Sequence, residues 1–384
     1  MKNKNKPMNE FPLMNENKGI PLFYPHIPSD AHKLLKKTLS SRWIGHGPKV
    51  EIFEKQFENK FLSGQKALAV GSGTDALHLS YLLSDIKKGD EVLVPVFTCT
   101  ATNIPLLYIG AKPVFIDIDP DTMNLSIDDI RKKITKKTKA IVCVDYGGVP
   151  NDYSSLLKIC KKNNLKLISD GAHSLGSKYN KKHVGTYSDF TTYSFQAIKT
   201  ITTGDGGMLV IKNKKLYEKA KRLRWFGIDR SKKQAGIWEN DVKEIGYKYQ
   251  MTDISATLGI SALSGIDKII KKRNNLFKAY ETELAKNKSI KIIGKSKTKK
   301  YFNGSWLITI LVDENDRIKL MKKLRSKNIE SAQVHYRNDR YSIFGGRRKD
   351  LKNMDALENQ YLVLPLHQRM TTKHVKFICS IINQ

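Results

Sequence analysis

The chain has 384 residues, 40% of them hydrophobic, and its 68 Lys and Arg residues against 37 Asp and Glu residues give a formal net charge of +31 at pH 7. This length and apolar content exclude a chain that is disordered as a whole and predict two or three globular domains. The four cysteines form no CxxC pair, which argues against a disulfide framework or a zinc cluster and favours a reducing compartment.

Residues 1–18 are a polar extension without the apolar run of a signal peptide, so we expect a cytoplasmic protein. The longest uncharged window, 92–111, contains two prolines and several Thr residues, which indicates a strand plus a loop and no membrane span. The lysines are dispersed, which indicates a solvated basic surface, with steering of a phosphorylated substrate as the second interpretation. No RRM, C2H2 or basic-zipper pattern accompanies the charge, so we expect no nucleic-acid partner.

Short apolar runs alternate with amphipathic stretches between about residues 60 and 215. The pattern predicts helices at 74–83 and 153–163, and strands at 66–70, 91–96, 113–118, 139–144, 165–170 and 206–211. Apolar strands that alternate with helices indicate parallel βαβ units covered on both faces. We therefore expect an α/β domain with a mainly parallel sheet.

The C-terminal third predicts a second, smaller α/β domain. Residues 252–285 predict a long helix, 308–336 predict a strand, a helix and a strand, and 371–383 predict a terminal helix. We expect the polar N-terminal extension at 1–18, the large domain at 19–255, and a linking helix with the small domain at 256–384.

A turn of small residues, Gly71-Ser72-Gly73-Thr74, follows the strand at 66–70 and opens a helix. The N-terminus of a helix offers unpaired N–H groups to a phosphate. The glycines also match a loose dinucleotide pattern, but the next strand ends without the carboxylate that a dinucleotide site needs. The turn therefore favours the phosphate of a mononucleotide or of a cofactor.

Two later segments complete a possible cofactor site. Asp170 ends the strand at 165–170 and precedes His173, although an Asp there is also a common helix cap. Lys199 lies among apolar and small residues before Gly204, and an apolar setting frees a lysine amine for Schiff-base formation. An imine-forming Lys, an Asp for a pyridinium nitrogen and a phosphate turn are what pyridoxal 5′-phosphate (PLP) chemistry requires.

These segments resemble the DegT/DnrJ/EryC1/StrS sugar aminotransferases, a branch of the type I, aspartate-aminotransferase-like PLP fold. The resemblance begins at residues 20–57, continues through 110–126 and ends with 246–263 and 361–375. It implies a PLP enzyme with a large domain and a smaller C-terminal α/β domain. It also implies a homodimer with shared active sites.

The resemblance carries roles to individual positions. Lys199 would hold the cofactor covalently and move protons, and Asp170 would keep the pyridine nitrogen protonated. His173 would approach the phenolic oxygen of the cofactor. Ser194 and the Gly73-Thr74 turn would hold the phosphate.

Three further aspects of the site remain open in the sequence. Lys248 stands where many members have an Asn that reaches the phosphate from the partner subunit, and a Lys can still pair with a phosphate as a point charge. Cys99 stands where an aromatic side chain usually stacks on the cofactor ring, so Phe97 or another aromatic covers the ring, or small apolar groups hold it. Residues proposed to contact substrate, each with a structural alternative, are Trp43, His46, His335 and Arg337.

The sequence therefore predicts PLP-dependent transamination of a nucleotide-linked 4-keto-6-deoxyhexose, with glutamate as donor, for glycan or polysaccharide precursors. The string SFQAIKTITTGDGG resembles C-4 aminating members more than C-3 aminating ones. Alternatives are a C-3 keto-sugar or cyclitol aminotransferase, the dehydratase branch, which has His in place of the lysine, and a cofactor-binding regulator or basic nucleic-acid-binding protein. The histidines show no metal-ligand spacing, so no metal is expected.

Overall fold

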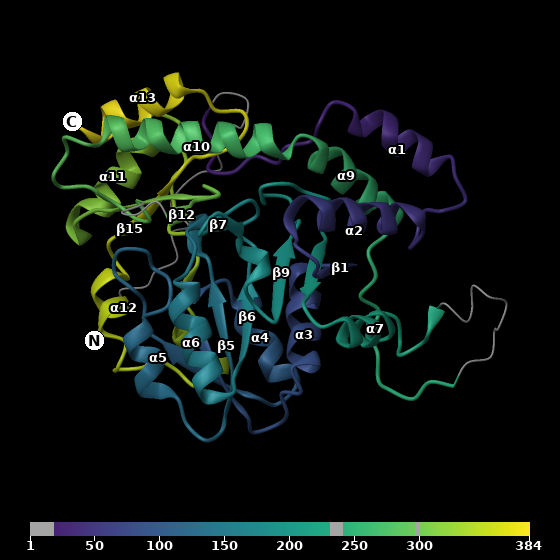
Figure 1. Ribbon diagram of the computed structural model, residues 1–384. Helices are drawn as coiled ribbons and strands as arrows, with labels where there is room; N and C mark the ends of the chain where they lie inside the picture. The colour runs from purple at the N-terminus through teal and green to yellow at the C-terminus, as the bar shows by residue number, and fades with distance from the viewer. Residues whose placement is uncertain (1–18, 231–240, 296–299) are drawn as a thin grey trace.

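The computed structural model describes residues 19–230, 241–295 and 300–384 (Figure 1). The polar extension expected at 1–18 lies outside the described residues. Within the described ranges, no helix combines the length and the apolar character that crossing a membrane requires.

A seven-stranded sheet forms the centre of the larger domain, in the order β1-β10-β9-β6-β5-β2-β4. Its strands are β1 (Lys66–Val70), β2 (Glu91–Pro95), β4 (Lys112–Ile116), β5 (Thr138–Val144), β6 (Lys166–Asp170), β9 (Phe190–Ser194) and β10 (Gly207–Ile211). The expected parallel arrangement is confirmed except at β10, which runs antiparallel to both of its neighbours. β10 follows β9 without a crossover helix, and parallel strands need such a crossover.

Helices cover both faces of this sheet (Figure 1). One face packs against α3 (Gly73–Leu83), α4 (Thr100–Tyr108) and α7 (Lys214–Leu223). The opposite face packs against α2 (Pro48–Phe61), α9 (Asp253–Ser264), α5 (Ile127–Lys133) and α6 (Tyr153–Asn163), and α1 (Ala31–Leu39) lies along α9. Because both faces are buried, the strands are nearly continuous apolar runs in the sequence.

The C-terminal domain is a small sheet covered by helices. Its antiparallel strands are β11 (Lys291–Ile292), β13 (Ile308–Leu311) and β15 (Tyr361–Leu364), and its helices are α10 (Ile266–Glu283), α11 (Glu314–Ser326) and α13 (Thr372–Ile382). The helix expected at 252–285 is two helices, α9 and α10, that meet at Gly265. α9 packs on the large sheet and α10 packs against α13, and the expected domain division at 255/256 stays a prediction.

Short strands tie the two parts of the chain together. β12 (Tyr301–Phe302) pairs with β7 (Lys178–Tyr179), which also pairs with β8 (Lys182–His183). The strand expected to end at residue 336 is divided between two partners. Ala332 forms an isolated antiparallel bridge with Val363 of β15, whereas the two-residue β14 (Tyr336–Arg337) pairs with β3 (Phe97–Thr98) of the large domain. The start of α12 (Lys352–Leu357) also binds the large domain, because the backbone N–H groups of Asn353 and Met354 donate to the carboxylate of Asp117.

Candidate active site

Asp170 lies at the carboxyl end of β6, where open α/β sheets bind their ligands. Its carboxylate accepts a hydrogen bond of 2.7 Å from the Thr102 hydroxyl of α4 and one of 3.1 Å from the backbone N–H of Ala172. Burial raises the pKa of Asp170, and these two hydrogen bonds oppose the rise. The Asp170 carboxylate is thus held in one orientation. A positively charged ring nitrogen of a bound cofactor would favour the ionised form of this carboxylate.

Lys199 lies in the loop between β9 and β10, beyond the same end of the sheet. The loop is held by a hydrogen bond from the backbone N–H of Lys199 to Gln196, and its return towards β10 uses Gly204 at a φ of +83°. The Lys199 amine lies 3.9 Å from the centre of the Trp306 ring. Burial lowers the pKa of Lys199 to about 8, and the nearby Asp170 carboxylate only partly opposes this. A fraction of the amine is therefore uncharged near neutral pH, as a nucleophilic amine must be.

His173 follows β6 and is buried against the rings of Trp306, His335 and Tyr146. Its imidazole stacks on Trp306 with ring centres 3.9 Å apart, and its Nε2 atom lies 3.2 Å from Nε2 of His335. Burial and the Lys199 charge lower the pKa of both histidines, that of His335 to about 3. The structure thus brings His173 and His335 together beside Lys199.

The turn at the start of α3 is shaped to admit a small anion. Ser72 caps the helix by accepting the backbone N–H of Asp75, and the first N–H groups of a helix have no acceptor within it. Gly73 faces Ser194 so closely that a Cβ added at Gly73 would lie 2.9 Å from the Ser194 Cβ. Thr74 follows in the first helical turn. A phosphate held here would sit between a helix N-terminus and a hydroxyl, and the positions expected for the phosphate are therefore adjacent.

Together these observations test whether the residues fit PLP. A partly deprotonated lysine, an oriented carboxylate and a cradle that a Cβ would fill all lie beyond the same end of the sheet, and His173 Nδ1 is buried without a partner among the described residues. The residues fit the cofactor.

Two residues that the sequence did not single out complete this arrangement. Thr102 orients Asp170, and Trp306 lies between His173 and the Lys199 amine while its indole N–H donates to Ile198. The only signals in the sequence were a hydroxyl one turn into α4 and an aromatic residue just before β13. Neither is specific enough to predict a site.

The structure corrects the expectation for Arg337. Its side chain is 0% exposed, and its guanidinium forms ion pairs with Asp339, Asp355 and Glu358. These carboxylates hold the pKa of Arg337 above its ordinary value despite its burial. The side chain is neither on the surface nor available to a sugar pyrophosphate, so we assign it a structural role.

Cys99 and Phe97 differ in where they lie. Cys99 is partly exposed at the N-cap of α4, close enough to Lys199 to influence its charge. Phe97 is buried in the core, where its ring packs against Tyr146 and Tyr361. Phe97 is therefore not free to cover a cofactor, and the aromatic ring beside the lysine is Trp306.

Three predicted residues lie outside this group within one chain. Lys248 Nζ packs 3.7 Å from the centre of the Trp225 ring and donates to Gln250. His46 contacts the backbone carbonyl of Met251, and its pKa is lowered to about 3 by burial and by nearby arginines. Trp43 is 41% exposed. Among the described residues, the contacts given above for these three side chains do not involve Lys199.

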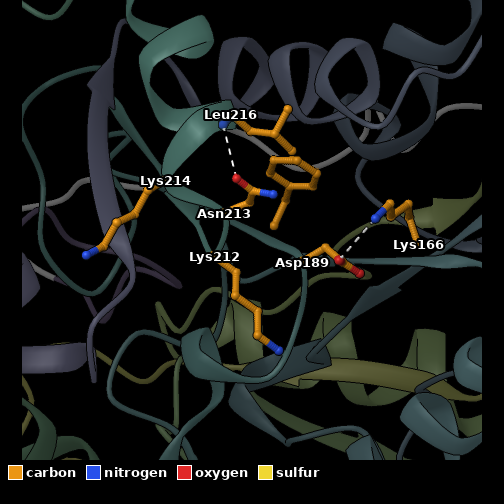
Figure 2. A pocket seen from close by; sticks show the side chains of 7 residues that line it. Lys166, Asp189, Lys212, Asn213, Lys214 and Leu216 are labelled. Atoms are coloured by element: carbon orange, nitrogen blue, oxygen red, sulfur yellow. Dashed lines mark hydrogen bonds and ion pairs between the residues drawn. The ribbon is translucent and has the colours of Figure 1, made fainter.

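A separate cavity of about 420 Å³ lies at the opposite end of the strands (Figure 2). Lys166 begins β6 and Asp189 precedes β9, whereas Asp170 ends β6, so this cavity is remote from the candidate site. Its lysines surround a helix N-terminus that Asn213 already caps. Within the described part of the chain, no group of three His, Cys, Asp or Glu side chains is placed to hold a metal.

Comparisons with known proteins agree with the site. Residues 25–383 match the DegT/DnrJ/EryC1/StrS aminotransferase family. The chain is 35% identical over 371 residues to a GDP-perosamine synthase of Escherichia coli O157:H7, covering 96% of this chain and 98% of that protein. Among solved structures, it resembles the sugar aminotransferase CalS13 from Micromonospora echinospora, with a TM-score of 0.89 and 28% identity over 95% of this chain and 99% of that one.

The PLP and PMP forms of the putative sugar aminotransferase Spr1654 from Streptococcus pneumoniae are also similar, with a TM-score of 0.88 over 95% of this chain and 98% of that one and identities of 28% and 29%. The chain belongs to the DegT/DnrJ/EryC1/StrS aminotransferase family, and it is a PLP-dependent sugar aminotransferase.

Proposed function

We propose that the enzyme aminates C-4 of a nucleotide-linked 4-keto-6-deoxyhexose, with glutamate as donor, to give a 4-amino-4,6-dideoxy sugar for a glycan. The observation that carries the proposal is the partly deprotonated Lys199 set beside the oriented Asp170 and the Gly73–Ser194 cradle. The choice of C-4 is supported by relatives named GDP-perosamine synthase in Escherichia coli and Vibrio cholerae, at 35% and 33% identity. A Saccharopolyspora spinosa relative, 32% identical, is named as a 4-aminotransferase.

Each residue of the site has a defined task in this proposal. Bound PLP supplies an electron sink for the carbon whose bonds change. Lys199 would hold the cofactor covalently, and its Nζ, once released, would carry the proton that the substrate carbon loses or gains. Asp170, oriented by its hydrogen bond from Thr102, would form an ion pair with the protonated ring nitrogen of the cofactor. The α3 turn and Ser194 would bind the phosphate of the cofactor. Trp306 and His173 exclude water on one side of the amine.

We also propose a homodimer in which each site is completed by the partner subunit. Lys248 is exposed and turned towards Trp225 rather than towards the Lys199 of its own chain. The resemblance to the family places this position at the phosphate of the neighbouring subunit. All four cysteines are free thiols, which suits the cytoplasm as the compartment of the enzyme.

The decisive experiment is a substrate panel. Purified enzyme is incubated with glutamate and with GDP-, dTDP- or UDP-linked 4-keto-6-deoxyhexoses, and the aminated carbon is identified by NMR. A 3-keto sugar nucleotide and a keto-cyclitol test the two nearest alternatives. Turnover of the 3-keto sugar nucleotide or of the keto-cyclitol, without turnover of any 4-keto-6-deoxyhexose, would contradict amination at C-4.

A Lys199→Ala variant is the control for the chemistry. We expect it to lose turnover on every substrate, because no other residue of the group offers an amine. A variant that keeps full turnover would refute the role of Lys199. A variant that loses turnover but keeps the cellular function of the protein would favour the cofactor-binding regulator.

A further inference from the structure

Two histidines that are distant in the sequence form a hydrogen-bonded pair beside Lys199. The Nε2 atoms of His173 and His335 are 3.2 Å apart, and the two rings are nearly coplanar, with an interplanar angle of 11° and centres 5.1 Å apart. This is the geometry of an edge-to-edge N–H···N hydrogen bond. Such a bond needs one Nε2 that carries a proton and one that does not, so each ring fixes the tautomer of the other.

The surroundings of the pair favour a single shared proton. Both rings are buried, and the charge of the nearby Lys199 amine lowers the pKa of each, so a second proton on the pair is disfavoured. The other groups packed against the pair are uncharged: Trp306 stacks on His173, and the Tyr146 ring meets His173 edge-on. The hydrogen bond is therefore the main polar constraint on the ring of His173.

The backbone holds His335 in a conformation that is costly for a residue with a side chain. His335 has a φ of +67°, in the left-handed region, and strain of this kind persists where the surrounding structure enforces it. The Tyr361 hydroxyl donates to the carbonyl of His335 over 2.6 Å. Immediately after His335, β14 pairs with β3.

The segment that follows His335 is anchored in the large domain by buried groups. The backbone N–H of Asn338 donates to Val96 over 2.6 Å, and its side-chain amide donates to Thr98 over 2.8 Å. Arg337 is locked by its three carboxylates. We name residues 335–339 the His335 strap. The anchored strap holds the backbone of His335 in its strained conformation and places the His335 imidazole against His173.

We propose that His335 is a positioning residue, which fixes the tautomer and the orientation of the His173 ring beside the cofactor attached to Lys199, and that it does not itself bind the sugar. The proposal rests on the proposed role of Lys199. In this proposal, the ion pairs of Arg337 hold the His335 strap in place.

The test uses the holoenzyme without substrate and follows the visible absorbance band of the bound cofactor as a function of pH. The variants are His335→Phe, which keeps a flat ring but no hydrogen bond, and His335→Gln, whose amide can replace the Nε2 contact. His173→Phe and the double variant His173→Phe/His335→Phe complete a double-mutant cycle. The control is His183→Phe, a histidine that packs against Phe61 outside the site.

We expect His335→Phe to shift the midpoint of the titration by roughly one pH unit, the size of effect that loss of one strong hydrogen bond produces. His335→Gln should restore most of the shift, and His183→Phe should leave the midpoint unchanged. In the cycle, His335→Phe should have no further effect once His173 is Phe. Steady-state kinetics should show a lower kcat with little change in KM for the sugar.

Two results would overturn the proposal. An unchanged midpoint with a raised KM for the sugar would make His335 a substrate contact, and shifts that add independently in the double variant would show that the two rings do not act as a pair. If His335→Phe fails to fold, His335→Leu, which also lacks the hydrogen bond, takes its place with the same expected shift of the midpoint. A Lys199→Ala variant that keeps the band and the turnover would instead refute the role of Lys199, so the two failures are distinguishable.

Discussion

At the scale of single residues, burial turns a common side chain into a reactive one. The chain has 68 Lys and Arg residues, yet Lys199 is the lysine for which burial lowers the pKa to about 8 next to an oriented carboxylate. The adjacent ring of Trp306 is too weak a partner to restore the charge that water would stabilise. Reactivity here is a property of the place rather than of the residue type.

This pKa predicts the pH dependence of cofactor attachment. Only the uncharged amine is a nucleophile, so the rate at which PLP attaches to the apoprotein should rise about tenfold per pH unit below pH 8 and level off above it. Stopped-flow absorbance on the apoprotein measures the rate. A lysine model compound should keep rising to about pH 10.4, the ordinary pKa of a lysine. A protein profile that follows the model compound would contradict the assignment.

Asp170 should act through its charge rather than through its shape. Asp170→Asn keeps an acceptor for Thr102 but removes the negative charge that would pair with a cationic ring nitrogen. We expect kcat to fall by about 100-fold or more, as for the loss of other preorganised electrostatic groups. Asp189→Asn, at the other end of the strands, is the control and should stay near wild type. Equal kcat values for the two variants would argue against the proposed role.

At the scale of elements, two connections decide which residues meet. The α3 turn places Gly73 against Ser194 of β9, and the β14–β3 pairing brings the His335 strap to the large domain. Neither connection is a long regular element. Each depends on a close approach between segments that are far apart in the chain, and each is therefore sensitive to single substitutions.

Gly73 should be intolerant of even one added methyl group. The Cβ of Gly73→Ala would lie 2.9 Å from that of Ser194, so the cradle must widen, and PLP affinity should fall roughly tenfold. Titration of the apoprotein with PLP measures the dissociation constant. The companion Ser194→Gly should relieve the clash in the double variant. Gly265→Ala, whose Cβ would have the Ala262 carbonyl oxygen as its nearest neighbour at 3.9 Å, should bind PLP normally.

Substitution of Arg337 should lower the free energy of unfolding rather than raise KM for the sugar. Arg337→Met leaves Asp339 buried without its partner, and breaking a buried ion pair in this way costs about 3–5 kcal/mol of unfolding free energy. Arg347→Met is a matched control, because Arg347 pairs with the same Asp355 and Glu358 from an exposed position, where a pair contributes at most about 1 kcal/mol. Urea denaturation compares the two. Unchanged stability with a raised KM for the sugar would contradict the structural role.

At the scale of the whole molecule, the site is shared between two domains and, in our proposal, between two subunits. Trp306 and His335 come from the C-terminal half, whereas Asp170, His173 and Lys199 come from the large domain. The large domain and the C-terminal half therefore have to be packed together before the group exists. If the substrate carries a pyrophosphate, as we propose, the net charge of +31 adds a field that attracts it, since a pyrophosphate is strongly anionic.

The shared site predicts complementation between two inactive variants. Lys199→Ala lacks the amine and Lys248→Glu repels a phosphate, but a mixed dimer carries one site with neither defect. Random mixing of equal amounts should restore about a quarter of wild-type activity, because about half of the dimers are mixed and each has one intact site. Activity after co-expression and joint purification measures this. No recovery in verified mixed dimers would refute a role for Lys248 across the interface.

The sequence by itself determined every strand of the large sheet except β9, together with the α3 turn and the order of Asp170, His173, Ser194 and Lys199. These features follow from local patterns, because apolar runs, small-residue turns and a lysine among apolar residues are visible within a few positions. The match to the family extends the same kind of information over residues 25–383.

Only the tertiary structure decided where Arg337, His335 and Trp306 lie and which residues they contact. An arginine in a short polar stretch looks accessible, and its burial becomes apparent only when Asp355 and Glu358 fold back against it. His335 meets His173 across 162 residues of chain, and Trp306 meets Lys199 from a different domain. Contacts at such separation depend on how whole elements pack, which no local periodicity or spacing encodes.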